Sequence, residues 1–290
     1  MMTRKLLSKI KLLDDPDEKI FELIKESFIN DGIEVIPYLE EIWLKSKNPL
    51  VQKRIENIIN SIQQANLIKE FTEWKNNGTK DLLYGAYLVA KYAYNEINWK
   101  NIEKVINKIK KDIWIELNEN LTALEKVRLL NYVLFDIHGY SVNSEEPNLI
   151  PNFYINNVID NKKGNAISLA ILYIGVAQRL NLPIFGVDVP KNFLACYIDA
   201  ISAFEAFGDN INTPVLFYIN PVNKGIVFGR REISQYLKKI KIKPIEEFYK
   251  PTTNIKIIER LISNLTVLYE QNGQHKKVDD LNNLLEILLK

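Results

Sequence analysis

The sequence predicts a predominantly helical α+β protein, and three observations lead to this fold class. Apolar residues recur at helical spacing in the N-terminal and C-terminal parts of the chain. Between these parts, one strongly apolar helix is followed by short runs rich in β-branched and aromatic residues, an order typical of a helix packed on an antiparallel sheet. The composition of the 290 residues, 47% apolar and 26% charged, is that of a globular chain. Its length indicates about two domains.

We expect the N-terminal region, residues 1–78, to be a helical repeat-like array. Its apolar stripes are interrupted at Gly32 and at Pro49, residue types that end helices. Each stripe covers one face only, so these short helices must stack to bury it, as they do in HEAT repeats. A non-repetitive helical bundle fits nearly as well. The third stripe consists of Val51, Ile55, Ile58 and Ile62.

The middle region, residues 79–250, holds the helix-then-strand pattern. Residues up to 137 continue the helical spacing, whereas residues 138–165 are rich in turn-forming residues and predict loops. Ile167–Leu180 is apolar nearly all round, which predicts a buried helix. The small antiparallel sheet is expected to consist of strands at Ile184–Val189, Phe193–Ile198, Val215–Ile219 and Ile226–Phe228.

The C-terminal region, residues 251–290, predicts a helical hairpin. Its turn is expected at Asn272-Gly273-Gln274, with an apolar stripe on each side. The pattern resembles a single tetratricopeptide-type unit, in which two antiparallel helices bury their facing stripes. Such a hairpin either completes the core or serves as a peptide-binding module, and the sequence leaves both open. The stripes consist of Ile258, Leu261, Leu265 and Leu268, and of Val278, Leu281, Leu285 and Leu288.

Charge and cysteine content argue against several classes of protein. The 38 basic and 36 acidic residues give a net charge of +2, which disfavours a nucleic-acid-binding surface. Cys196 is the only cysteine, so no intramolecular disulfide is expected. With His138 and His275 as the only histidines, we expect no metal site and no cofactor. The N-terminus lacks the pattern of a signal peptide and no apolar run approaches about 20 residues, so we expect a cytoplasmic protein without a membrane contact.

Several short motifs occur in order between residues 156 and 221. They include Lys163-Gly164-Asn165-Ala166-Ile167-Ser168-Leu169, Ala177-Gln178-Arg179-Leu180, Pro190-Lys191-Asn192-Phe193-Leu194 and Ile219-Asn220-Pro221. Together these motifs resemble the core of transglutaminase-like proteins and, more closely, of the bacterial Sir-B-type invasion-regulator family. The resemblance implies a helical N-terminal region, a transglutaminase-like core and a C-terminal tetratricopeptide-like hairpin.

The resemblance also implies where a catalytic triad would lie. In catalytic members a cysteine begins the buried helix, a histidine on a neighbouring strand takes the thiol proton, and an aspartate on the next strand orients the imidazole. The matching positions of this chain carry Ala166, Asn192 and Asn220. Alanine has no nucleophilic atom, and an asparagine amide neither holds a proton near neutral pH nor carries a charge. We therefore predict that the chain has no catalytic residue and that these three positions are vestigial.

A non-catalytic, cytoplasmic protein-binding or scaffolding and regulatory module is the predicted function. The expected partner is another protein or peptide, and a small-molecule ligand in the old cleft is a further option. The stretch Lys162-Lys163-Gly164-Asn165, just before a helix start, indicates an anion held on backbone N–H groups. The predicted binding residues are Asn165, Ser168, Asn192, Tyr197 and Asn220.

The alternative is a hydrolase or acyl transferase with a non-classical nucleophile in the same cleft. Ser168 lies two positions into the same helix, and Cys196 lies on the strand after Asn192. A serine nucleophile needs a base within hydrogen-bond reach, and the matching strand position offers only an asparagine. A single strand cysteine between apolar residues is usually an inert small hydrophobe. A regulator that touches nucleic acid is the third hypothesis, and it requires basic residues concentrated on one surface.

Overall fold

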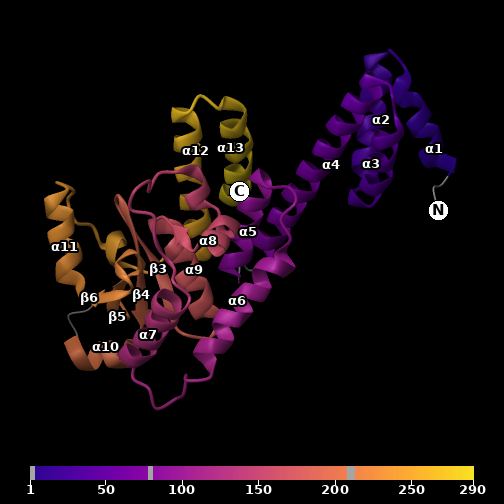
Figure 1. The fold of residues 1–290 in the computed structure, drawn as a ribbon. Helices are drawn as coiled ribbons and strands as arrows, with labels where there is room; N and C mark the ends of the chain where they lie inside the picture. Colours follow the sequence, from indigo (N-terminus) through magenta and orange to yellow (C-terminus); the bar gives the residue numbers. More distant parts are fainter. Residues whose placement is uncertain (1–3, 78–80, 208–212) are drawn as a thin grey trace. The chain divides into compact units, whose positions relative to one another are not determined.

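The computed structural model describes residues 4–77, 81–207 and 213–290 of the chain. The chain divides into two compact units, Met1–Glu73 and Trp74–Lys290. Figure 1 shows the order of their helices and strands along the sequence. Helices dominate, and a four-stranded antiparallel sheet is the main β-structure of the described residues, which confirms the predicted α+β class. The predicted boundaries after residues 78 and 250 stay a prediction.

The first unit is a cluster of helices around an aliphatic core. The Asp17 side chain caps the second helix by accepting from the N–H of Lys19 at 2.8 Å, and Gly32, with φ of 78°, ends that helix. Its core side chains include Leu13, Phe28, Ile55 and Ile58, all fully buried. The helices are α1 (Arg4–Lys11), α2 (Glu18–Asp31), α3 (Ile36–Lys45) and the part of α4 (Pro49–Asn76) that belongs to this unit, with short 3-10 turns at Leu12–Asp14 and Ile33–Val35.

The second unit begins with helices that surround one central helix, α9 (Ala166–Arg179). The helix α9 is buried along its length, as its apolar sequence predicts, and it contacts α5, α6 and α8. The surrounding elements are α5 (Leu82–Ala93), α6 (Trp99–Trp114), α7 (Ala123–Asn131), the π-helical turn Tyr132–Ile137, the 3-10 turn Ile150–Phe153 and α8 (Ile155–Asn161). Two short parallel strands, β1 (Ser141–Val142) and β2 (Lys163–Gly164), lead into α9.

The main sheet has the strand order β3-β4-β5-β6, and every neighbouring pair is antiparallel. Its members are β3 (Ile184–Val189), β4 (Asn192–Ile198), β5 (Val215–Asn220) and β6 (Ile226–Phe228). The helix α9 lies against β3 and β4. On the other face, Val187, Leu194 and Cys196 pack in one apolar cluster with Ile233 and Leu237 of α11 (Arg230–Lys239). The sheet is therefore enclosed between α9 and α11.

The chain ends in two antiparallel helices, α12 (Asn254–Gln271) and α13 (His275–Leu289), which lie side by side in Figure 1. The turn between them contains Gly273 with φ of 68°, as the sequence predicts. A buried hydrogen bond of 2.8 Å joins the hydroxyls of Tyr154 and Tyr269, and α12 also contacts α5 and β3. Through these contacts α12 packs on the core of the second unit.

Three helices of the second unit are absent from the sequence prediction, and the longest of them is α11. The prediction of loops over residues 138–165 misses α8, whose Ile155, Val158 and Ile159 are buried. The second is α10 (Ala200–Phe207), which follows β4 directly. The helices α8 and α10 are shorter than the length at which apolar periodicity becomes distinctive, since they have 7 and 8 residues.

Candidate functional site

Ala166 is the first residue of α9, and a capping box fixes the turn before it. The Oδ1 of Asn165 accepts from the N–H of Ser168 at 3.0 Å, and the Oγ of Ser168 accepts from the N–H of Asn165 at 3.0 Å. Gly164 precedes this box, and a β-carbon there would lie 2.6 Å from the Oγ of Ser168. The sequence Gly-Asn-Ala-Ile-Ser therefore places Ala166 at the positive end of a buried helix dipole.

A polar network connects the start of α9 to the loop of residues 143–149. The Oγ of Ser168 donates to the carbonyl oxygen of Asn152 at 2.6 Å, and the Nδ2 of Asn152 donates to the carbonyl oxygen of Glu146 at 2.6 Å. Both Ser168 and Asn152 are buried, so these hydrogen bonds are shielded from water. The network positions Pro147 and Asn148 next to the helix start.

Asn192 and Asn220 lie at the same end of two neighbouring strands. Asn192 is the first residue of β4, and its Oδ1 accepts from the N–H of the next residue at 2.9 Å. Asn220 is the last residue of β5, and its Oδ1 accepts from the N–H two residues on at 3.1 Å, which caps the 3-10 turn Pro221–Asn223. Because Ala195 pairs with Ile219 in this antiparallel register, the two asparagines lie near the same end of the two strands.

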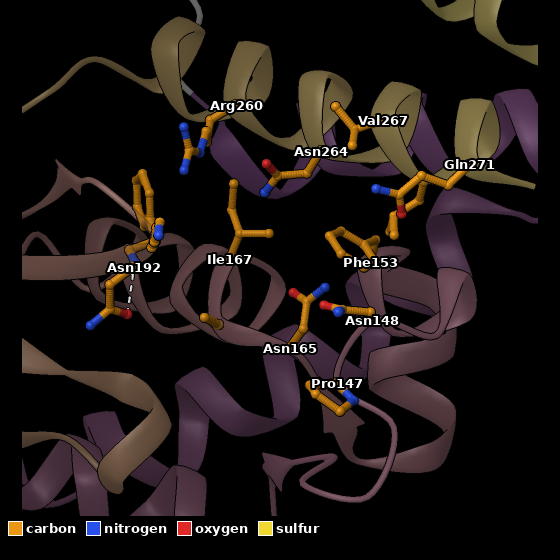
Figure 2. Close-up of a pocket in the computed structure, with 14 residues that line it drawn as sticks. Pro147, Asn148, Phe153, Asn165, Ile167, Asn192, Arg260, Asn264, Val267 and Gln271 are labelled. Atoms are coloured by element: carbon orange, nitrogen blue, oxygen red, sulfur yellow. Dashed lines mark hydrogen bonds between the residues drawn. The ribbon is translucent and has the colours of Figure 1, made fainter. Parts of the chain in front are cut away.

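A pocket of about 380 Å³ opens over the first turn of α9 (Figure 2). One wall is formed by α9 and the start of β4, a second by the loop with Pro147 and Asn148, and a third by one face of α12. This volume lies in the usual range of small-ligand sites. The residues that line it are Pro147, Asn148, Phe153, Asn165, Ala166, Ile167, Lys191, Asn192, Phe193, Arg260, Asn264, Val267, Leu268 and Gln271.

The lining of this pocket is electropositive. Lys191 and Arg260 contribute two cations, and none of the described residues that line the pocket carries a carboxylate. The Nε of Arg260 lies 3.9 Å from the Oδ1 of Asp188, a half-exposed contact at the limit of an ion pair. Asn165 is only 5% exposed, and its Nδ2 has no hydrogen-bond partner. The site therefore offers donors and positive charge.

Comparison with known proteins fits this arrangement of a helix start, a sheet edge and a covering helix. A family model described as the transglutaminase-like superfamily matches residues 100–263, more than half of the chain. The chain belongs to the transglutaminase-like superfamily. No solved structure matches the chain.

Three curated relatives show how far the similarity extends. A UPF0162 protein of Xylella fastidiosa is 32% identical over 126 residues, 42% of this chain and 45% of the relative. A UPF0162 protein of Buchnera aphidicola is 26% identical over 193 residues, 65% of this chain and 66% of the relative. The human F-box only protein 21 is 26% identical over 160 residues, 55% of this chain but 24% of that protein. The chain thus matches less than half the length of the Xylella relative.

The transglutaminase-like core brings two of the three predicted vestigial positions into one pocket. Ala166 and Asn192 both line the pocket, whereas Asn220 lies outside its lining. Of the predicted binding residues, Asn165 and Asn192 line it. Ser168 lies beneath it, and Tyr197 is buried farther along β4, with its ring 5.3 Å from that of Phe217. The two lysines of the predicted anion-binding stretch, at 162 and 163, are exposed outside the lining.

Neither alternative nucleophile has the environment of a reactive group. Ser168 is 1% exposed, and its Oγ is occupied by the cap and by the carbonyl of Asn152, with no titratable base among these partners. Cys196 is fully buried, and burial raises the pKa of its thiol to about 12. Burial also raises the pKa of Tyr197. These groups stay protonated near neutral pH.

The pocket also contains residues of α12 and of the β3–β4 turn, which were not predicted as site residues. Arg260, Asn264 and Gln271 share one face of α12. The helix was predicted from its apolar stripe alone, so these polar residues were not recognised as part of a site. Lys191 lies in the two-residue turn between β3 and β4 with φ of 59°, a left-handed conformation that is unusual for lysine. The Pro-Lys-Asn sequence, with a proline before this lysine, was the available signal for a tight turn.

Other chemistry-bearing groups of the described chain lie apart from this pocket. The Nε2 of His138 lies 2.9 Å from the Oδ2 of Asp112, and His275 begins α13. Within residues 4–77, 81–207 and 213–290, no group of three or more histidine, cysteine, aspartate or glutamate side chains is arranged to hold a metal ion. Among the helices that the structure describes, none combines the length and the apolar character needed to cross a membrane.

Proposed function

We propose that this transglutaminase-like core is non-catalytic and acts as a binding or scaffolding and regulatory module of the cytoplasm, with the pocket over α9 as its recognition site. The observation that carries the proposal is Ala166 at the first position of α9. In this superfamily fold, that position lies where a helix dipole would stabilise a thiolate. A methyl group there cannot attack a carbonyl, and Asn192 at the edge of the same pocket cannot take up a proton.

The partner that fits this site best is a protein or peptide. The lining mixes apolar side chains with carboxamides, groups that pair with a polypeptide backbone. The net charge of +2 gives little support to nucleic-acid binding or to an electrostatic membrane contact. The α12–α13 hairpin supports the tetratricopeptide-like element that the resemblance to the Sir-B-type family implies.

The alternative enzyme, with Ser168 or Cys196 as nucleophile, has no supporting observation. The Oγ of Ser168 already donates to a buried carbonyl, and its removal from that bond would leave the carbonyl unpaired. The thiol of Cys196 belongs to the apolar cluster between the sheet and α11, away from the pocket lining. We therefore keep one proposed function.

A turnover assay on the purified chain tests the absence of catalysis. Ammonia release from glutamine peptides and incorporation of a labelled amine would be measured at pH 7 to 9. We expect both rates to equal the rate without protein, because the pocket holds no nucleophile and no base. The double variant A166C/N192H is the control, since alkylation of its new thiol would show that reagents reach the pocket. Turnover by the wild-type chain that iodoacetamide abolishes would refute the proposal.

A capture experiment tests the binding role. Wild-type protein and the variant Ala166→Trp would be incubated with the same native extract, because an indole at the helix start would fill the pocket. We expect a partner that the wild type retains and the variant loses. Asn120→Trp, at an exposed position outside the lining, is a control for the added indole. Identical sets of captured proteins for all three would contradict a role of the pocket.

A further inference from the structure

The start of α9 presents donors that the chain itself leaves unused. In any α-helix the first N–H groups lack an acceptor in the preceding turn. Here the side chain of Asn165 satisfies the N–H of Ser168, and the first intrahelical bond runs from Leu169 to the carbonyl of Asn165. The N–H groups of Ala166 and Ile167 therefore have no acceptor within the helix. Both residues line the pocket.

A second donor at the same place is unpaired and does not belong to the helix backbone. The side chain of Asn165 is 95% buried, and its Oδ1 is used by the cap, but its Nδ2 meets no acceptor. In Figure 2 this amide extends from the start of α9 towards the space below α12, between Ile167 and Asn148. A buried amide donor without an acceptor is unusual in a folded protein and indicates a missing partner. That partner supplies a hydrogen-bond acceptor, and in peptides the acceptors are chiefly oxygens.

The positively charged side chains around the pocket favour a ligand oxygen that carries negative charge. Lys191 enters from the β3–β4 turn and Arg260 from α12, and no described lining residue is acidic. Asp188 is the carboxylate nearest to Arg260 at 3.9 Å, and it lies outside the lining. A planar carboxylate suits the combination of backbone N–H groups, an amide and a guanidinium, because each of its oxygens accepts two hydrogen bonds.

The remaining lining residues indicate what carries this carboxylate. Asn148, Asn192 and Asn264 offer both amide donors and carbonyl acceptors around the opening, the pattern that matches peptide groups. Phe153 and Leu268 supply an apolar surface beside them. A free inorganic anion would use the donors but not this surface.

We propose that the pocket over α9 binds a carboxylate of a peptide, held by the N–H groups of Ala166 and Ile167, the Nδ2 of Asn165 and the guanidinium of Arg260. The inference rests on the proposed binding function and adds the ligand class. The carboxylate comes either from a peptide C-terminus or from an acidic side chain, and both present the same two oxygens to the site.

Titration with short peptides tests the ligand class. The probes are N-acetyl-Ala-Ala-Leu as the free acid, the same peptide as its C-terminal amide, N-acetyl-Ala-Glu-Ala amide and inorganic phosphate. Binding would be followed by the side-chain amide signal of Asn165 in 1H–15N spectra and by calorimetry. We expect at least one carboxylate peptide to bind at least tenfold more tightly than the amide of the first peptide, with a shift of the Asn165 signal. The peptide that binds more tightly identifies the source of the carboxylate.

The variant Asn165→Asp separates ligand binding from folding. Aspartate keeps the oxygen that caps Ser168 and is an equally good N-cap residue, but it replaces the free donor by a second, negative oxygen. We expect it to weaken carboxylate binding at least tenfold. Asn98→Asp makes the same change at the N-cap of α6, outside the pocket, and should leave binding unchanged within twofold. Arg260→Gln, on the partly exposed face of α12, is a second variant should Asn165→Asp fold poorly, and it should weaken the acid more than the amide.

Three results would overturn the inference. If the acid and the amide bind equally well, the carboxylate is not the group that the pocket recognises. The pocket would still bind peptides, so the proposed function would stand. If phosphate binds as tightly as the carboxylate peptides, the pocket binds anions in general and does not recognise the peptide. The absence of binding by every probe, with Asn165 signals unchanged, would refute the ligand class, and the capture experiment would then judge the binding role separately.

Discussion

Replacing Gly164 by alanine tests the capping geometry on which the pocket depends. The added β-carbon would lie 2.6 Å from the Oγ of Ser168, which is too close for a contact, and 3.1 Å from a methyl carbon of Val158, which is tight. The Oγ cannot rotate away freely, because it accepts from the N–H of Asn165 and donates to the carbonyl of Asn152. Its displacement leaves two buried backbone groups unpaired, at about 1 to 1.5 kcal/mol each. We expect Gly164→Ala to lower the free energy of unfolding by about 2 to 3 kcal/mol.

Thermal unfolding followed by circular dichroism measures this loss. For a domain of this size each 1 kcal/mol lowers the melting temperature by about 2 to 4 °C, so a decrease of about 4 to 12 °C is expected. The control is Gly229→Ala at the N-cap of α11, where the new β-carbon would lie 3.3 Å from the exposed carboxylate of Glu232. Because that carboxylate can move into solvent, the control should cost less than about 1 kcal/mol.

A double-mutant cycle identifies the atom responsible. Ser168→Ala removes the Oγ, so adding Gly164→Ala to that variant should cost at most half of what it costs in the wild type. If Gly164→Ala costs the same in both backgrounds, the collision with the Oγ is not the source of the loss. The capping argument for the pocket would then be wrong.

Three further predictions concern a buried thiol, a polar bridge and the vacant nucleophile position. Since burial raises the pKa of the Cys196 thiol to about 12, iodoacetamide at pH 8 should modify this thiol only after unfolding, and equal labelling of the folded and unfolded protein in mass spectrometry would contradict this. The unfolding free energy should also fall as the pH rises above about 9, because only the thiol of the unfolded chain ionises there. Asn131→Ala should cost about 2 to 4 kcal/mol in urea unfolding, because it leaves the buried hydroxyl of Tyr173 and the carbonyl of Gly225 unpaired, and the cost should be smaller in a Tyr173→Phe background. Ala166→Cys should lose affinity for the carboxylate peptide as the pH rises from about 6 to 8, because a thiolate at a helix N-terminus would occupy the site; a pH-independent affinity would contradict this.

Local sequence signals were sufficient for much of the second unit. The predicted strand at Ile184–Val189 has the observed bounds of β3, because Pro183 and Pro190 delimit a run of β-branched and aromatic residues. The buried helix was predicted one residue late at its start, since Asn165 rather than Ala166 is its cap. In contrast, α10 was missed because its sequence is short and its Phe204 and Phe207 stay exposed, so no core-facing stripe reveals it.

The candidate site was predictable only where its residues belong to a motif. Ala166 and Asn192 lie in motifs that carry the resemblance, and both line the pocket. Asn220 lies in such a motif too, but its amide caps the turn after β5. In the sequence, all four strands of the main sheet lie between Ala166 and Arg260. No local pattern indicates that α12 covers the start of α9. That wall depends on tertiary contacts such as the one between Tyr154 and Tyr269.

The proposed loss of the nucleophile and the proposed gain of an anion site would be two consequences of one substitution. A cysteine at the start of this helix supplies its own negative charge, since the dipole and the free N–H groups stabilise the thiolate. Ala166 removes that charge and leaves the helix, the cap and the free Nδ2 of Asn165 in place. The same donors then favour an anion from outside the chain. A neutral asparagine at position 192 adds no competing carboxylate to the lining, so an incoming carboxylate meets the cations Lys191 and Arg260 without a lining residue of its own charge.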